Sequence, residues 1–247
     1  MPELPIPESF PFPNINTKVS DNDVMLSGRD FKHYLALGVS AQQFISAATA
    51  FAGGVNVTDI LDLPCGHGRV TRVLRAAFPN ASIVVSDIDR DGVDFCAKTF
   101  NATPIYSSPD FKKLNLGRKF DVVWVGSLIT HLPANKTIEL LSCLLRHLKI
   151  GGLVIASTHG AFVAGRVQIP WISGLGAYAL SYAGTEKMLS EYFGIGYGYS
   201  PYPTNETYVP NNDQSEQTYG VSLITREWFE GTLKSLGAEV LIYRAHA

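Results

Sequence analysis

The sequence has few cysteines, no long apolar run and no excess of positive charge, and each absence excludes a class of protein. Its three cysteines, Cys65, Cys96 and Cys143, include no Cys-x-x-Cys pair, which argues against a disulfide framework or a zinc ribbon. No stretch of about 18 apolar residues is available to span a membrane. The net charge of −2 gives no overall attraction to nucleic acid.

The N-terminus also lacks the features of a secretion signal. It reads MPELPIPESFPFPNINTK, with acidic residues and prolines where a signal has a basic segment and an apolar run. We therefore expect a cytoplasmic protein with reduced thiols, which acts neither on nucleic acid nor on a membrane.

Strand-like apolar runs alternate with amphipathic segments through the middle of the chain. The runs are VTDILDL, SIVVSD, TPIYSS, KFDVVWVGS and LVIAST, and helical patterns appear at GRVTRVLRAAF, RDGVDFCAKTF and IELLSCLLRHL. This order predicts an α/β fold, a Rossmann-like, doubly wound, mostly parallel sheet with helices on both faces. Ligand sites in such sheets lie at the carboxyl ends of the strands.

Segments on either side complete the predicted organisation. Residues 1–52 are predicted to form an N-terminal arm and lid helices, with the helical pattern interrupted near Gly38. Residues 53–247 are the predicted main domain, with a lid insertion at about 159–220 that holds eight of the eleven tyrosines. In the insertion, TEKMLSEYF is predicted as a helix and the rest as loop. REWFEGTLKSLG predicts a final helix and AEVLIYRA a final strand, with GVSLIT as another source of a strand.

The first predicted strand ends in the glycine-rich turn DLPCGHG. Gly66 and Gly68 let a ligand approach the backbone, although the turn alone also fits a simple tight bend. A dinucleotide site would have a third glycine where Thr71 stands. Asp87, at the end of the second strand, is placed to bind both hydroxyls of a ribose, and Asp89 to cap the next helix. Together these features indicate an adenosine ligand that carries a small charged group.

These motifs resemble the class I S-adenosylmethionine-dependent methyltransferase superfamily. ILDLPCGHG is similar to the family's first motif, usually written VLDxGCGxG, and IVVSDID is similar to its second-strand acid motif. FDVVWVGSLITHLP and LLRHLKIGGLVIAST resemble the fourth-strand motif and the helix and strand that follow. The resemblance covers about residues 55–158. It implies S-adenosyl-L-methionine as the cofactor and S-adenosyl-L-homocysteine as its product.

The resemblance also assigns cofactor contacts. The loop after the first strand would contact the methionine part, the end of the second strand the nucleoside, and the end of the fourth strand the sulfonium. HYLALG near the N-terminus resembles an arm that closes over the cofactor. The residues so assigned are Asp62, Pro64, Gly66, His67, Gly68, Asp87, Ile88, Gly126, Ser127 and Tyr34. Pro64 stands where the family usually has its first glycine, so its position must donate no hydrogen bond to the cofactor. His67 either touches the cofactor or caps the helix.

Two histidines that follow predicted strands are candidates for a general base. His131 follows the fourth strand and His159 the fifth. A hydroxyl that accepts a methyl group must lose its proton, which a neutral imidazole can take. Alternatively, His131 caps the next helix or packs against the first motif. Neither an i, i+4 histidine pair nor a carboxylate cluster accompanies these residues, so no metal site is predicted.

Tyrosines of the predicted lid suggest aromatic walls that suit an apolar or glycosidic acceptor. Those predicted to bind substrate are Tyr178, Tyr182, Tyr197 and Tyr219; alternatively, they form the core of an added subdomain or a dimer contact. We therefore predict an enzyme that O-methylates a small-molecule acceptor, namely a small metabolite, a natural product or a sugar. An NAD(P)-dependent oxidoreductase and a non-catalytic, methyltransferase-fold partner protein are the alternatives. An unpaired sheet edge near the C-terminus would favour a homodimer.

Overall fold

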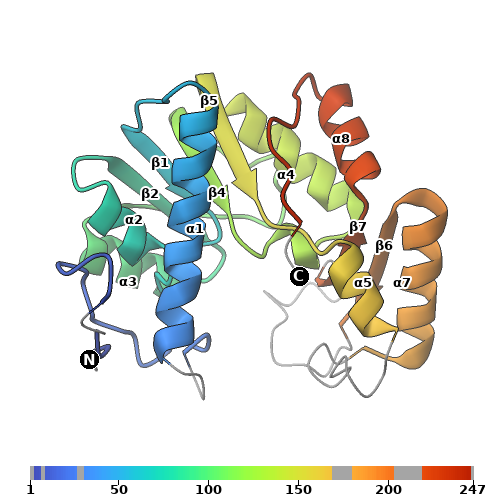
Figure 1. Ribbon diagram of the computed structural model, residues 1–247, viewed down its shortest axis with the longest axis horizontal. Coiled ribbons are helices and arrows are strands. Elements are labelled where there is room, and N and C mark those ends of the chain that lie inside the picture. The colour runs from blue at the N-terminus through green and yellow to red at the C-terminus, as the bar shows by residue number, and fades with distance from the viewer. Residues whose placement is uncertain (1–2, 7–8, 27–30, 169–179, 203–218, 246–247) are drawn as a thin grey trace. The chain divides into compact units, whose positions relative to one another are not determined.

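The structure is a computed structural model of the 247-residue chain. It describes residues 3–6, 9–26, 31–168, 180–202 and 219–245. The chain forms two compact units, one of residues 1–126 and 146–155 and the other of residues 127–145 and 156–247 (Figure 1). This division differs from the predicted one, because the N-terminal arm belongs to the same unit as the central sheet.

The first unit is built on a five-stranded sheet in the order β3-β2-β1-β4-β5. The strands are β1 (Asp59–Asp62), β2 (Ser82–Asp87), β3 (Thr103–Tyr106), β4 (Phe120–Val125) and β5 (Leu148–Ala156). β1 pairs in parallel with β2 and β4, and β2 pairs in parallel with β3. The predicted Rossmann-like α/β sheet is confirmed. The strand order reverses between β1 and β4, which is where sheets of this kind bind ligands.

Three helices of the first unit, α1 (Phe31–Phe51), α2 (Thr71–Ala77) and α3 (Arg90–Phe100), share one core with the sheet (Figure 1). Buried side chains of these helices, Ile45 among them, pack with Ile83 and Val122 of the strands. Val84 and Val123, which alternate with those strand residues, are buried as well. Burial of both faces explains why these strands read as nearly continuous apolar runs.

Helix α1 is continuous, so the predicted interruption near Gly38 is wrong. Gly38 lies in the middle of the helix, where a Cβ would stand 2.6 Å from the carbonyl oxygen of Arg69. The glycine therefore permits a close approach of α1 to the start of α2 and does not break the helix.

The N-terminal arm packs on the first unit. Its described part runs through turns, with one bridge between Glu3 and Lys18. Leu4, Ile15 and Val19 are buried in a cluster with residues of α1 and α2. The arm is therefore anchored by apolar contacts as well as by its hydrogen bonds.

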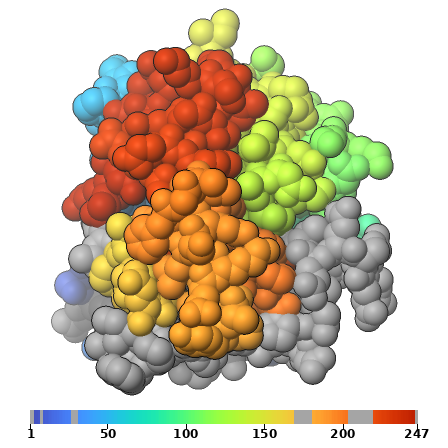
Figure 2. Space-filling view, turned by 90° about the vertical axis from the view of Figure 1, so that its right-hand side faces the viewer, coloured from blue at the N-terminus to red at the C-terminus, as the bar shows by residue number. Residues whose placement is uncertain are grey.

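The second unit combines helices with a two-stranded antiparallel sheet. Its elements are η1 (Ile129–His131), α4 (Ala134–Arg146), α5 (Ala161–Val167), α7 (Tyr182–Ile195), β6 (Tyr197–Pro201), β7 (Gly220–Ile224) and α8 (Arg226–Ser235). Helix α7, orange in Figure 2, packs through Met188 and Tyr192 against Val221 and Leu223 of β7. The predicted helices at TEKMLSEYF and REWFEGTLKSLG are confirmed as α7 and α8.

Two predictions for this unit are wrong. GIGYGYSPYP contains strand β6 where a loop is predicted, because Gly198 and Gly220 permit a close backbone approach. A Cβ on Gly198 would overlap the Met188 carbonyl, and one on Gly220 the Ser200 carbonyl. AEVLIYRA forms no strand over its described residues 238–245. GVSLIT contains β7, which pairs with β6 in a two-stranded sheet and adds no strand to the five-stranded one. The described helices include none of the length and apolarity that a membrane span requires.

Candidate functional site

The loop of residues 63–70 leaves the carboxyl end of β1 at the reversal of strand order. Gly66 and Gly68 both have left-handed backbone, with φ of 48° and 84°. Their surroundings differ, because a Cβ on Gly66 would meet no described atom within 4 Å whereas one on Gly68 would overlap the ring of Phe100. Gly66 therefore leaves space for a ligand on the side where a Cβ would stand, and Gly68 allows the loop to pack against α3.

Asp62, the last residue of β1, is a buried carboxylate. Its Oδ2 accepts a hydrogen bond from the Thr71 hydroxyl at 2.6 Å, while its buried Oδ1 has no hydrogen-bond donor among the described residues. Burial raises the pKa of Asp62 from 3.8 to about 7, and the nearby charge of Asp87 acts in the same direction. A buried acceptor without a donor fits a ligand that brings a cation or an N–H group.

Asp87, at the end of β2, holds the same loop. Its Oδ2 accepts from the Gly66 N–H at 2.8 Å, and its Oδ1 accepts from the Asp89 N–H at 3.0 Å. Burial is the main cause of the raised pKa of Asp87. The carboxylate retains lone pairs for ligand hydroxyls. Asp89 caps α3 by accepting from the Gly92 N–H, which confirms the predicted cap.

The remaining loop residues are held by neighbouring elements. His67 is buried, and its Nε2 lies 2.9 Å from Oδ2 of Asp91 in the first turn of α3. This contact supports a role in holding the loop to α3. On either side of Pro64, the Leu63 N–H donates to the Trp124 carbonyl and the Cys65 N–H to the Ser86 carbonyl. The N–H that proline lacks is therefore not required to hold this backbone.

The other predicted cofactor residues have different surroundings. Tyr34 is 1% exposed and its hydroxyl donates to Asp23 at 2.7 Å, so it is not among the residues that we propose to contact a ligand. Ile88 is half-buried after β2. Gly126 ends the first unit's main segment, and Ser127, with φ of 57°, donates its N–H to the Ser157 hydroxyl in the second unit at 2.8 Å.

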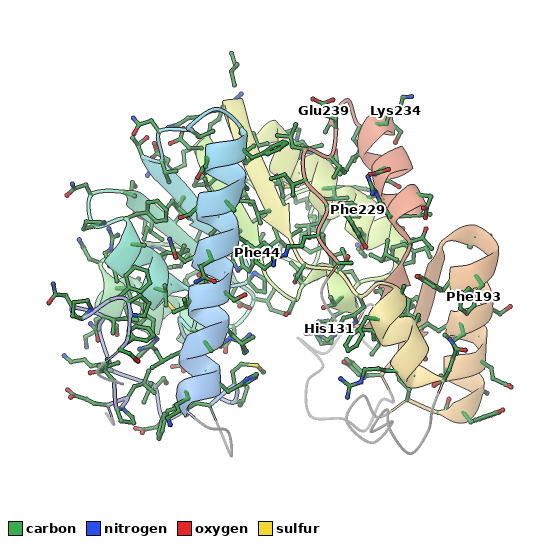
Figure 3. All side chains as sticks on the ribbon, in the orientation of Figure 1. Phe44, His131, Phe193, Phe229, Lys234 and Glu239 are labelled. Atoms are coloured by element: carbon green, nitrogen blue, oxygen red, sulfur yellow. The ribbon has the colours of Figure 1, made fainter. Side chains whose placement is uncertain are left out.

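The structure brings His131 and His159 together in the second unit, with ring centroids 6.4 Å apart. His131, labelled in Figure 3, lies in η1, and its Nδ1 is 2.8 Å from the carbonyl oxygen of Gly220. Because a carbonyl only accepts, Nδ1 carries the proton and Nε2 is left as an acceptor. The Tyr202 hydroxyl is 3.2 Å from the same Nδ1, and the Tyr219 ring stacks on His131 at 4.8 Å between centroids.

Both imidazoles are neutral at pH 7. Burial lowers the pKa of His131 below its usual 6.5. Burial, reinforced by the charge that His131 can carry, lowers the pKa of His159 to about 4. A general base works best with a pKa near the operating pH, and the pKa of His159 is shifted far from it.

The four predicted substrate tyrosines differ in their surroundings. Tyr219 lies against His131, as a substrate-side residue would. Tyr197 is 3% exposed and its hydroxyl bonds to Leu132 and Thr137, which fits the alternative that it is a core residue of the unit. Tyr182 is 69% exposed on α7 and its hydroxyl pairs with Glu186, which places it on the surface. Tyr178 lies outside the described residues.

Sequence reasoning missed several residues of these sites. Tyr202 beside His131, and Arg72 and Asp91 around the glycine loop, carry no motif of their own. The contact of Tyr202 depends on the pairing of β6 with β7, and those of Arg72 and Asp91 depend on how the N-terminal arm and α3 pack beside the loop. Within the part of the chain that the structure describes, no group of three or more histidine, cysteine or carboxylate side chains is arranged to hold a metal ion.

Comparisons with known proteins agree with this geometry. Residues 61–154 match a family model described as a methyltransferase domain. The chain is 29% identical to malonyl-[acyl-carrier protein] O-methyltransferase of Bacillus cereus over 102 residues, 41% of this chain and 37% of that protein. Its counterpart from Acetivibrio thermocellus is 30% identical over 103 residues, 41% of this chain and 36% of that protein. The matched segment thus spans little more than a third of each curated relative.

A solved structure shows the same fold over most of the chain. It is an S-adenosylmethionine-dependent methyltransferase from Clostridium acetobutylicum, with a TM-score of 0.50 and 16% sequence identity. The superposition covers 87% of this chain and 83% of that chain. At this identity the likeness supports the Rossmann-like fold.

Proposed function

We propose that residues 61–154, which match a methyltransferase domain, belong to the class I S-adenosylmethionine-dependent methyltransferase superfamily, and that the chain transfers the methyl group of S-adenosylmethionine to a hydroxyl of a small molecule. The acceptor is a small metabolite, a natural product or a sugar. The observation that carries this proposal is the pair of buried carboxylates, Asp62 and Asp87, beside the open space at the Cβ position of Gly66.

The charge of the site supports this cofactor. S-adenosylmethionine has a sulfonium, an ammonium and one carboxylate, so its net charge is positive. Asp62 Oδ1 is available to accept a hydrogen bond from the ammonium, and Asp87 is available to accept from the ribose hydroxyls. Ile88 offers apolar surface to the adenine. The bound cofactor supplies an electrophilic methyl group, and the protein supplies binding and orientation.

The same charges disfavour the oxidoreductase alternative. A dinucleotide would bring an anionic pyrophosphate to a glycine turn that lies above the buried carboxylate of Asp62. Burial already raises the pKa of Asp62 and of Asp87, and a further negative charge would oppose their ionisation. The turn also has Thr71 where a third glycine would stand.

His131 is the proposed general base. Its Nδ1–H donates to the Gly220 carbonyl, which orients the ring and leaves Nε2 free of a proton. In this proposal Nε2 takes the hydroxyl proton of the acceptor. His159 has a pKa of about 4, so in this proposal it packs beside His131 and does not take the proton of the acceptor. The stacked ring of Tyr219 offers a flat face to an acceptor.

Calorimetric titration with S-adenosylhomocysteine and with NADH tests the cofactor. We expect S-adenosylhomocysteine to bind in the micromolar range, and Asp62→Asn and Asp87→Asn to weaken it by about tenfold, as loss of a hydrogen bond to a charged group does. Asp121→Asn is the matched control, because Asp121 bonds Lys149 at the amino end of the strands. Binding of NADH without binding of S-adenosylhomocysteine would contradict the proposal.

Incubation with a methyl-labelled cofactor and a panel of acceptors tests the reaction by mass spectrometry. The panel contains alcohols, phenols and sugars, together with a malonyl thioester because the curated relatives are malonyl-[acyl-carrier protein] O-methyltransferases. We expect label on a neutral hydroxyl, and we expect His131→Asn to lower turnover by about 10²-fold or more. Cofactor binding without transfer to any acceptor would favour the non-catalytic partner protein.

A further inference from the structure

A buried arginine of α2 joins the N-terminal arm to the glycine loop. Arg72 is 1% exposed, and its Nε donates to the carbonyl oxygen of Gly68 at 3.1 Å. Its Nη1 donates to the carbonyl oxygens of Asn16 and Lys18, at 2.9 and 2.8 Å. One guanidinium therefore bonds to backbone of the arm and to backbone of the loop.

Tyr34 of α1 completes this connection. Its hydroxyl donates to Asp23 Oδ2 at 2.7 Å and lies 3.5 Å from Nη2 of Arg72. The guanidinium also lies over the Tyr34 ring, 5.5 Å from the centroid. Asp23, which belongs to the arm, is 6% exposed. The arm is thus fastened to α1 and α2 by polar groups that are buried together.

A second connection passes through His67. Oδ2 of Asp91 lies 2.9 Å from Nε2 of His67 and accepts from Nδ2 of Asn22 at 3.0 Å. The hydrogen bond with His67 is the main cause that lowers the pKa of Asp91. The Asp91 side chain is 59% exposed, so this link contributes less than the buried guanidinium does. It nevertheless ties the arm to the loop at an independent point.

The loop needs such support because it has little stiffness of its own. Gly66 and Gly68 lose more conformational entropy than other residues when they are fixed. A ligand that requires this backbone binds more weakly if it must also order the loop. We propose that Arg72 and Asp91 are positioning residues, which use arm residues 15–23 to hold residues 65–68 in the conformation that binds S-adenosylmethionine. For its ligand, this inference rests on the proposed function.

Arg75 provides a matched control for a role that is only structural. It lies one turn further along α2 and also donates to backbone carbonyls, those of Pro79, Ala81, Phe100 and Asn101. None of these four acceptors belongs to the arm or to the glycine loop. Loss of Arg75 should therefore disturb the first unit without releasing the loop.

The experiment compares Arg72→Met, Arg75→Met and Asn22→Ala by titration with S-adenosylhomocysteine. We expect the dissociation constant to rise about tenfold or more in Arg72→Met and about two- to fivefold in Asn22→Ala. In Arg75→Met it stays within about twofold, although both arginine variants unfold at lower temperature. Hydrogen exchange of the Gly66 and Gly68 amides in the free protein should speed up in Arg72→Met alone among the arginine variants.

Equal dissociation constants in Arg72→Met and Arg75→Met, with equal exchange at the loop, would overturn the inference. If Arg72→Met does not fold, Arg72→Lys, which keeps the charge but loses the planar fork, takes its place. Failure of the wild-type protein to bind S-adenosylhomocysteine would overturn the proposed function instead. The exchange rates then still decide whether the arm orders the loop: unchanged rates in the Arg72 variant refute it, and faster rates support it.

Discussion

Replacing Asp62 by asparagine removes the ionisable group beneath the glycine loop and keeps an acceptor for Thr71. The pKa of Asp62 is raised from 3.8 to about 7. Below pH 3.8 the carboxyl is protonated in the folded and the unfolded chain, so it adds no pH dependence. Between 3.8 and about 7 the unfolded chain releases the proton first, so rising pH favours unfolding. Above about 7 both states are ionised and the difference is constant.

The rise in pKa from 3.8 to about 7 corresponds to roughly 4 kcal/mol of stability that the wild-type protein loses across this pH window. Asp62→Asn abolishes the loss. The amide that replaces Oδ1 has no acceptor among the described residues, which costs about 1–3 kcal/mol at every pH. The informative quantity is therefore the difference in unfolding free energy between Asp62→Asn and the wild type, followed as a function of pH. Its value at a single pH also contains the constant cost of the amide.

Urea unfolding of both proteins at a series of pH values from about 4 to about 8 measures this difference. We expect Asp62→Asn to gain roughly 4 kcal/mol relative to the wild type over the series. Asp121→Asn is the control: the pKa of Asp121 is lowered to about 2, with the Lys149 hydrogen bond as the main lowering cause. Its stabilisation is complete above pH 3.8 and is lost as the pH falls toward 2. Parallel wild-type and Asp62→Asn curves would refute the argument.

Three further changes separate the roles of individual residues. Gly66→Ala should fold, at a cost of about 1–2 kcal/mol for its left-handed backbone, yet weaken S-adenosylhomocysteine binding in a titration. Gly68→Ala should cost more, about 2–4 kcal/mol in urea unfolding, because its Cβ would overlap Phe100. Lys149→Met leaves Asp59 and Asp121 without their shared ion pair; we expect about 1 kcal/mol less stability and an unchanged dissociation constant. The acid limb of the pH–rate profile should lie below pH 6.5, since burial lowers the pKa of His131.

The sequence was sufficient to predict the central sheet because burial on both faces leaves long apolar runs. Val84 and Val123 read as strand residues for that reason. Asp62 and Asp87 could be assigned to strand ends because parallel strands place their carboxyl ends along one edge. Local patterns and a single rule of sheet topology were therefore enough for this part of the chain.

Pairing between distant segments could not be predicted in the same way. Strand β6 is rich in glycine and tyrosine, and it forms because Gly198 admits the Met188 carbonyl and because β7 arrives some twenty residues later. Tyr197 and Tyr219 look alike in the sequence. Tyr197 points into the core of the second unit whereas Tyr219 stacks on His131, a difference fixed by that pairing.

Asp62 lowers the stability of the folded protein, and the same feature of this residue is needed for ligand binding. Asp62 Oδ1 has no donor among the described residues, so at neutral pH the buried carboxylate destabilises the folded protein, and an apolar residue would relieve that cost. The same oxygen is what a cationic ligand requires, and binding of the cation would return the pKa of Asp62 toward its ordinary value. Below about pH 7, affinity for S-adenosylhomocysteine should therefore rise with pH more steeply in the wild-type protein than in Asp62→Asn, where Asp87 is the remaining titrating carboxyl. A flat wild-type profile would mean that the ammonium does not lie beside this carboxylate.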